Sequence, residues 1–239
     1  MSKIKDFYEK HQILVAVFWI VLYCAVMAPI KGEDGYASVR MLLALIVIAA
    51  AMTAFIKANH LEKRFGLSGW PKDTKRLLYL IPMWILATGN LWDGFSLSFQ
   101  GGALLIASLS MILIGYVEEV LFRGFLLRGM LAEGKTVVAI VVSALTFGLG
   151  HIVNLFAGQA SFETFMQVIF AVAWGFIFTM VAFKSGSIIP CIIAHAMIDV
   201  FSLYGADHET GDWISIIATI VVAIVYCLYL KKQKTEKTE

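Results

Sequence analysis

The sequence has little charge for its length. Asp, Glu, Lys and Arg make up 15% of the 239 residues, whereas 60% are hydrophobic and the mean hydropathy is +0.82. A soluble domain typically contains about 25% charged and about 45–50% apolar residues. The excess of apolar residues cannot be hidden in one soluble core. The composition therefore excludes an ordinary soluble protein and indicates that lipid surrounds much of the chain.

Proline and cysteine are also scarce. With four prolines and 19 dispersed glycines, no linker divides the chain, and we expect residues 1–239 to form a single membrane domain. Cys24, Cys191 and Cys227 lie far apart in apolar stretches without the spacing of a metal site, so we expect them to be small buried side chains. We find no internal repeat of the kind that builds inverted-repeat transporters.

Eight apolar segments approach the roughly 20 residues that a helix needs to cross a bilayer. They are residues 11–30, 37–56, 77–92, 103–127, 137–156, 165–183, 188–204 and 213–230. The third segment is short and contains Pro82, so we expect a kink there or an extension toward Phe95. These segments predict an all-α, polytopic membrane protein with about eight transmembrane helices.

The basic residues are concentrated on one side of this arrangement. All but three of the 19 Lys and Arg fall in the two terminal tails or in alternate connections between the predicted spans. The exceptions are Arg123, inside a span, and Lys31 and Arg40, on the opposite side. By the positive-inside rule, both termini face the cytoplasm. We therefore expect an integral multi-pass protein of a bacterial-type cytoplasmic membrane.

Ionisable residues within the spans are rare and gather in three places. An ionisable group in a span costs about 2.5–3.5 kcal/mol on insertion scales and is a functional candidate by default. The fourth span contains Glu118, Glu119 and Arg123, the fifth contains His151, and the seventh contains His195 and Asp199. A lone histidine in an apolar helix is more often a packing residue than a ligand. An acid pair and two histidines on three spans are harder to explain by packing, and they predict a polar intramembrane cavity.

Spacing assigns different partners to these residues. Glu119 and Arg123 are four residues apart with the acid first, which favours an ion pair, whereas Glu118 lies about 100° around the helix and has no such partner. Glu118 is therefore the candidate to accept a proton from water. Asp199 lies one turn after His195, where it can accept a hydrogen bond from the imidazole and stabilise its protonated form.

The fifth span adds a helix-packing signal. Gly148 and Gly150 precede His151 and permit close approach of a neighbouring helix. Phe147 lies one turn before the histidine, and we expect it to contact the substrate.

These motifs resemble those of the CPBP family of membrane proteases. The family groups Ras-converting-enzyme-like CAAX prenyl endopeptidases with Abi bacteriocin-processing and immunity proteins. Its motifs are Glu-Glu-x-x-x-Arg, Phe-x-x-x-His and His-x-x-x-Asn or Asp. Here they are Glu118, Glu119 and Arg123, then Phe147 and His151, then His195 and Asp199. The resemblance covers roughly residues 77–204, the expected catalytic core. It implies an eight-span fold whose cavity opens to the cytoplasm.

The resemblance also implies an activity and residue roles. The chain would be an intramembrane endopeptidase acting on a peptide or membrane-associated protein, near its C-terminus or after a leader segment, with the lipid bilayer as its other partner and no nucleic acid. Glu118 and His151 would activate water, and His195 would donate to the oxyanion. Asp199 replaces the commoner asparagine, and an ionised aspartate cannot donate a hydrogen bond. We therefore expect Asp199 to act through His195.

A metal site is a further possibility for the same residues. Glu118, His151 and His195 could supply three zinc ligands and leave a fourth position for water. The sequence lacks the His-Glu-x-x-His motif that usually indicates a zinc protease. We expect a metal-free mechanism, with a divalent metal such as zinc as the alternative.

Two other functions use the same residues. A non-catalytic immunity or scaffold protein would bind a peptide or partner in the cavity without cleaving it. A proton-coupled transporter would use Glu118 and His151 as a proton relay, although the missing repeat disfavours this interpretation.

Overall fold

The computed structural model describes residues 3–71, 78, 80–206 and 209–235, with only the backbone for 209–215. The helices before the motif region are α1 (Lys3–Lys10), α2 (Gln12–Asp34), α3 (Val39–Ala58), α4 (Ile81–Ala87) and the 3₁₀ turn η2 (Gly89–Leu91). The remaining elements are α5 (Gly101–Glu119), η3 (Val120–Leu127), α6 (Arg128–Ala132), α7 (Thr136–Gly150), η4 (His151–Leu155), α8 (Ser161–Ser185), α9 (Ile189–Ser202) and α10 (Glu209–Lys232). In the described residues, β structure is limited to one isolated bridge between Phe95 and Gly205. The predicted all-α class is confirmed.

Five helices of the described chain are long and apolar enough to cross a membrane. They are Gln12–Asp34, Val39–Ala58, Gly101–Ala132, Thr136–Leu155 and Ser161–Ser185. Only 17% of the apolar window of α2 is buried inside the protein, and side chains such as Leu14 and Phe18 are mostly exposed. The exposed apolar face favours lipid over water, and the helical hydrogen bonds allow the backbone to lie in lipid. The chain is an integral multi-pass membrane protein.

The third predicted segment differs most from expectation. Leu77 and Tyr79 lie outside the described residues, and beyond them α4 has only seven residues, with Pro82 in its first turn. The 3₁₀ turn η2 follows, and the Asn90 side-chain amide donates to the Ile198 carbonyl of α9 at 2.8 Å. Proline lacks a backbone donor and fits the first helical turn, which explains the position of Pro82 at the start of α4.

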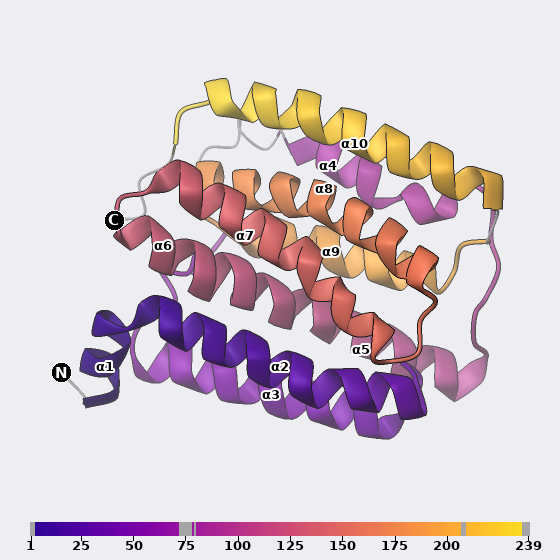
Figure 1. Ribbon diagram of the computed structural model, residues 1–239, viewed down its shortest axis with the longest axis horizontal. Helices are drawn as coiled ribbons and strands as arrows, with labels where there is room; N and C mark the ends of the chain where they lie inside the picture. Colours follow the sequence, from indigo (N-terminus) through magenta and orange to yellow (C-terminus); the bar gives the residue numbers. More distant parts are fainter. Residues whose placement is uncertain (1–2, 72–77, 79, 207–208, 236–239) are drawn as a thin grey trace.

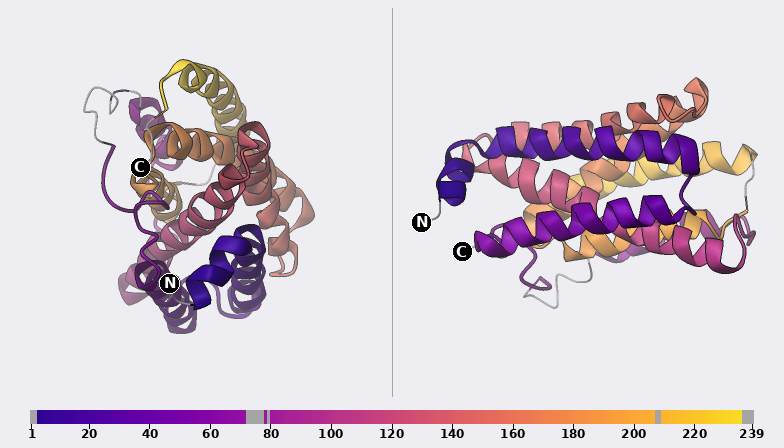
Figure 2. Two further views of the ribbon diagram at one scale, coloured as in Figure 1. Left: turned by 90° about the vertical axis from the view of Figure 1, so that its left-hand side faces the viewer. Right: turned by 90° about the horizontal axis from the view of Figure 1, so that it is seen from below.

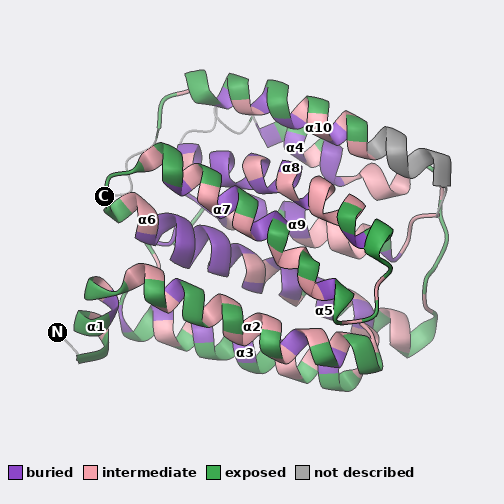
Figure 3. Ribbon diagram, viewed as in Figure 1, coloured by how far each residue is buried: buried purple, intermediate pink, exposed green. Residues whose placement is uncertain are grey.

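The helices run side by side, with both termini at one end of the bundle (Figure 1). α2 and α3 contact each other and lie together at one side of the bundle, as the left view of Figure 2 shows. The continuous segment α5–η3–α6 crosses the middle and contacts α3, α9 and, through η3, α2 and α7. Buried residues concentrate along η3 and α8 (Figure 3). The motif-bearing segment is therefore the centre of the packing.

Small residues set how closely α7 and α8 pack. The predicted close approach at Gly148 is present, since its Cα faces the Val172 backbone of α8, whereas Gly150 makes only ordinary contact with Phe122. Gly175 of α8 faces α7 in return, and a Cβ at position 175 would lie 2.5 Å from the Ala144 carbonyl oxygen. Membrane helices gain their packing energy from such close contacts.

The Gly175→Ala variant is expected to be less stable than wild type. The added methyl would force α7 and α8 apart, and overpacking of this kind costs about 1–3 kcal/mol. The measurement is the thermal unfolding midpoint in detergent micelles. Gly102→Ala is the matched control, because a Cβ at that helical position meets no atom within 4 Å. Equal midpoints for the two variants would contradict the assigned α7–α8 contact.

Candidate active site

Glu119 and Arg123 form a fully buried ion pair at the junction of α5 and η3. The Arg123 guanidinium donates to Glu119 Oε1 at 2.7 Å and to the Gly175 carbonyl at 3.2 Å, and both side chains are 0% exposed. The guanidinium carbon also lies 4.2 Å from the centre of the Phe147 ring and 5.3 Å from that of Phe178. A charge without water needs such partners. The ion pair predicted from the spacing is confirmed.

His195 of α9 contacts all three acids of the motifs. Its Nδ1 lies 3.0 Å from Glu119 Oε1, and since a carboxylate can only accept, Nδ1–H is the donor. Its Nε2 lies 3.5 Å from Asp199 Oδ2 and 3.9 Å from Glu118 Oε2. The hydrogen bond that orients the ring therefore goes to Glu119 on a different helix, whereas Asp199, the partner expected from spacing, makes a longer ion pair.

Aromatic rings hold the His195 imidazole from two sides. Phe178 stacks on it with a 5.6 Å centroid separation and an interplanar angle of 27°. The edge contact with Phe147 has a 5.4 Å separation and an angle of 83°. These contacts restrict ring rotation, so Nε2 keeps facing Glu118 and Asp199.

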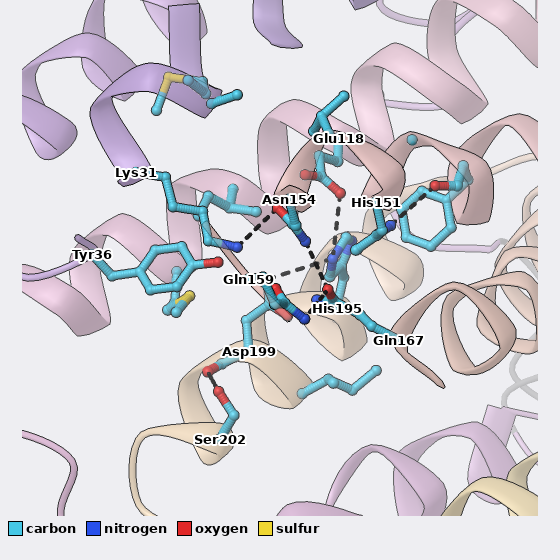
Figure 4. A pocket seen from close by; sticks show the side chains of 18 of the residues that line it. Lys31, Tyr36, Glu118, His151, Asn154, Gln159, Gln167, His195, Asp199 and Ser202 are labelled. Atoms are coloured by element: carbon cyan, nitrogen blue, oxygen red, sulfur yellow. Dashed lines mark hydrogen bonds and ion pairs between the residues drawn. The ribbon is translucent and has the colours of Figure 1, made fainter. Parts of the chain in front are cut away.

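Glu118 differs from Glu119 by facing open space. Its side chain is 14% exposed, against 0% for Glu119. One oxygen, Oε1, accepts a hydrogen bond from the Tyr23 hydroxyl of α2 at 2.8 Å. The other, Oε2, points toward His195 Nε2 (Figure 4). Of the two adjacent acids, Glu118 is therefore the one that solvent or a ligand can reach.

His151 begins η4, directly after α7. Its Nδ1 lies 3.2 Å from the Phe147 carbonyl, which can only accept, so this contact assigns the proton to Nδ1 and leaves a lone pair on Nε2. Phe147 is only 3% exposed and touches both imidazoles, with centroid separations of 5.5 Å to His151 and 5.4 Å to His195. Phe147 lines the cavity, but its main contacts position the two histidines and Arg123.

A cavity of about 550 Å³ connects these groups. Glu118, His151, His195 and Asp199 line it together, and Phe147 forms part of its wall. Figure 4 shows Lys31, Tyr36, Asn154, Gln159 and Gln167 around the same space. Residues from the fourth, fifth and seventh predicted spans thus meet in one pocket, which is the polar cavity expected from the sequence.

Helix lengths explain how His151 reaches the depth of Glu118. The fourth span continues to Ala132, five residues beyond the predicted end, so Glu118 lies about 20 Å from that end. His151 stands at the far end of α7. Both residues therefore belong to the half of the bundle remote from the termini.

The fourth span is not a regular α-helix. Residues Val120–Leu127 are π-helical, and all eight are buried. The Ser143 hydroxyl of α7 donates to the Phe122 carbonyl at 2.9 Å, which satisfies a group in the widened turn. Segments of π-helix occur frequently at functional sites. Periodicity in the sequence gave no indication of this stretch.

The side chains do not form the three-ligand metal site considered from the sequence. Within the described residues, no group of three or more His, Cys, Asp or Glu side chains is arranged to hold a metal ion. Glu118 directs one oxygen to Tyr23, and both histidines donate through Nδ1, so the atoms left to face the cavity are Glu118 Oε2 and the two Nε2 atoms.

Several residues that line the cavity or pack on His195 had no signal in the sequence. Tyr23 lies on an apolar span outside all three motifs, and Phe178 is one of 17 phenylalanines. Lys31 was attributed to the flank of the first span, yet its Nζ donates to Asn154 Oδ1 at 2.9 Å inside the cavity. Asn154 in turn donates to Gln167 Oε1 at 2.7 Å. Only Lys31 could have indicated a further cavity residue from the sequence, because it is ionisable and lies next to the end of a span.

Comparison with known families identifies the motif-bearing region. Residues 100–201 match the family described as type II CAAX prenyl endopeptidase, Rce1-like. This stretch contains all three motifs, and the predicted family resemblance is confirmed over it. No curated protein and no solved structure matches the chain.

Proposed function

We propose, from the Rce1-like domain at residues 100–201, that the chain is an intramembrane endopeptidase in which Glu118 activates water. The observation that carries the proposal is the unequal placement of two adjacent acids: Glu119 is fully buried, whereas Glu118 faces a cavity beside His195 Nε2. A general base must combine access to water with a fixed position. The substrate is a peptide or membrane-associated protein, processed near its C-terminus or after a leader.

The proposed reaction begins with a water molecule held by Glu118 Oε2 and the free Nε2 of His151. The carboxylate takes a proton as the water oxygen attacks the peptide carbonyl. His195 donates from Nε2 to the oxygen that becomes negative, and Asp199 and Glu119 stabilise the imidazolium. When the C–N bond breaks, Glu118 returns its proton to the leaving amine. The cavity walls keep this chemistry away from lipid.

The proposal extends to the whole chain. Residues 1–239 form one membrane domain whose eight apolar segments lie within the bilayer, the third as the short helix α4. Both termini are cytoplasmic, and the catalytic core spans roughly residues 77–204. The match to residues 100–201 and the position of α9 against α5 support that core.

The direct test is mass spectrometry of a peptide panel incubated with purified protein in lipid nanodiscs. The panel contains prenylated C-terminal peptides, unprenylated analogues and leader-type peptides, and metal content is measured on the same sample. We expect cleavage of at least one class, and a fall of about 10²–10⁴-fold in His151→Ala, as for loss of a general acid–base partner. Binding without cleavage in every class would favour the immunity or scaffold function.

Tyr23→Phe is expected to lower kcat about 10-fold or more with little change in KM. The variant loses the hydroxyl that fixes Glu118 Oε1, and a hydrogen bond to a charged group contributes about 1.5–3 kcal/mol. Tyr116→Phe is the matched control, because that hydroxyl contacts Thr53 instead. If both variants had the same kcat as wild type, Tyr23 would not position the base.

A further inference from the structure

The cavity reaches only one end of the helix bundle. Its lining includes Tyr36 from the α2–α3 connection, Gln159 from the η4–α8 connection and Ser202 from the last turn of α9. Glu163 and Ser202 are exposed on its rim, whereas His195, at its base, is 5% exposed. The three connections or helix ends that supply the rim all lie away from the termini (Figure 1). A ligand therefore has its route to Glu118 from that end.

Packed side chains close the opposite end. Below the Glu119–Arg123 pair, the rings of Phe65 and Phe125 lie 4.7 Å apart, and Tyr8 contacts both; all three are 0% exposed. Arg128 adds hydrogen bonds of 3.1 Å to each of two carbonyls, those of Ala182 and Gly186. These packed groups lie between the cavity and the end with the termini.

The closed end is also the basic end. Among the described residues, the tails and connections there hold every Lys and Arg except Lys31, Arg40 and Arg123. At the open end, Arg40 forms surface ion pairs with Glu33 at 2.7 Å and Asp34 at 3.2 Å, which neutralise it. Lys31 instead turns into the cavity toward Asn154. Positive charge retained on the cytoplasmic side orients a membrane protein, so the closed end faces the cytoplasm.

We propose that the cavity opens to the extracytoplasmic side of the membrane and that its substrate is an extracytoplasmic peptide or the outer juxtamembrane segment of a membrane protein. This is opposite to the cytoplasmic opening implied by the resemblance. The choice of substrate rests on the proposed function, whereas the side of opening does not.

Cysteine labelling in intact cells tests the side of opening. The three native cysteines are replaced by alanine, and one cysteine is added, either as Ser202→Cys on the rim or as Lys63→Cys at the closed end; both positions are exposed. With a membrane-impermeant maleimide, we expect Ser202→Cys to label at least 10-fold more than Lys63→Cys in intact cells. After permeabilisation both should label, and the cysteine-free parent should not.

Any other labelling pattern, including equal labelling of the two positions in intact cells, overturns the proposed orientation. Labelling needs no catalysis, so an inactive protein would still report the side of opening. A peptide cleaved by the purified protein is then added outside sealed right-side-out or inside-out vesicles. We expect cleavage in right-side-out vesicles alone; cleavage confined to inside-out vesicles would overturn the extracytoplasmic substrate while leaving the protease assignment intact.

Discussion

Glu118→Gln is expected to abolish detectable cleavage, with kcat/KM falling about 10²–10⁴-fold, the usual contribution of a general base. A neutral amide cannot take the proton of the attacking water. The amide oxygen can still accept from the Tyr23 hydroxyl, which in wild type lies 2.8 Å from Glu118 Oε1. The variant should therefore fold normally and lose only chemistry. The measurement is product formation by mass spectrometry under single-turnover conditions, beside thermal unfolding of the same sample.

Glu133→Gln is the matched control for this experiment. It makes the same chemical change at an exposed position after α6, at the end remote from the cavity. Its activity should equal that of wild type. Normal cleavage by Glu118→Gln would remove Glu118 as the base, and the unequal exposure of the two adjacent acids would then reflect packing alone.

Arg123→Met should have the largest effect on stability. It leaves Glu119 buried without its strongest partner, and breaking a buried pair from one side costs about 3–5 kcal/mol. The loss includes the hydrogen bond to the Gly175 carbonyl and the contact with the Phe147 ring. Chemical unfolding in detergent micelles measures the decrease in the free energy of unfolding. Arg40→Met is the matched control, since its ion pairs are exposed and should contribute little.

Combining Arg123→Met with Glu119→Gln separates stability from catalysis. The double variant contains no unpaired buried charge at this site, so much of the lost unfolding free energy should return. Activity should stay low, because His195 Nδ1 then donates to a neutral amide and its imidazolium is less stabilised. If the double variant were as active as wild type, the charge of Glu119 would have no part in positioning or supporting His195.

The two acids show what spacing can predict within one helix. The interval of four between Glu119 and Arg123 places them on one helical face, and the ion pair is present. The same reasoning predicted Asp199 as the hydrogen-bond partner of His195. In the structure, His195 Nδ1 instead donates to Glu119, which lies 76 positions earlier in the chain. Within a helix, the rise and turn per residue are fixed, whereas distances between helices depend on how side chains pack.

The third segment and the fourth span show where pattern reasoning failed. Apolar content predicted a short third span over 77–92, kinked at Pro82 or extended toward Phe95. The structure instead has a helix of seven residues with Pro82 in its first turn, followed by a 3₁₀ turn. In the fourth span, apolar periodicity could not indicate the π-helical turns of Val120–Leu127, since apart from Arg123 the stretch has no polar side chains to mark a helical face. Local backbone geometry there depends on tertiary partners such as Ser143.

The sequence by itself determined that the chain is helical, lies in a membrane and carries an acid pair and two histidines on three apolar spans. Composition and spacing suffice for these conclusions because lipid burial and helical geometry act locally. Only the tertiary structure decided that Tyr23 holds Glu118, that His195 joins three acids, and that the cavity reaches the end remote from the termini. Those features depend on the tilt and contact of helices far apart in the chain, which no local pattern specifies.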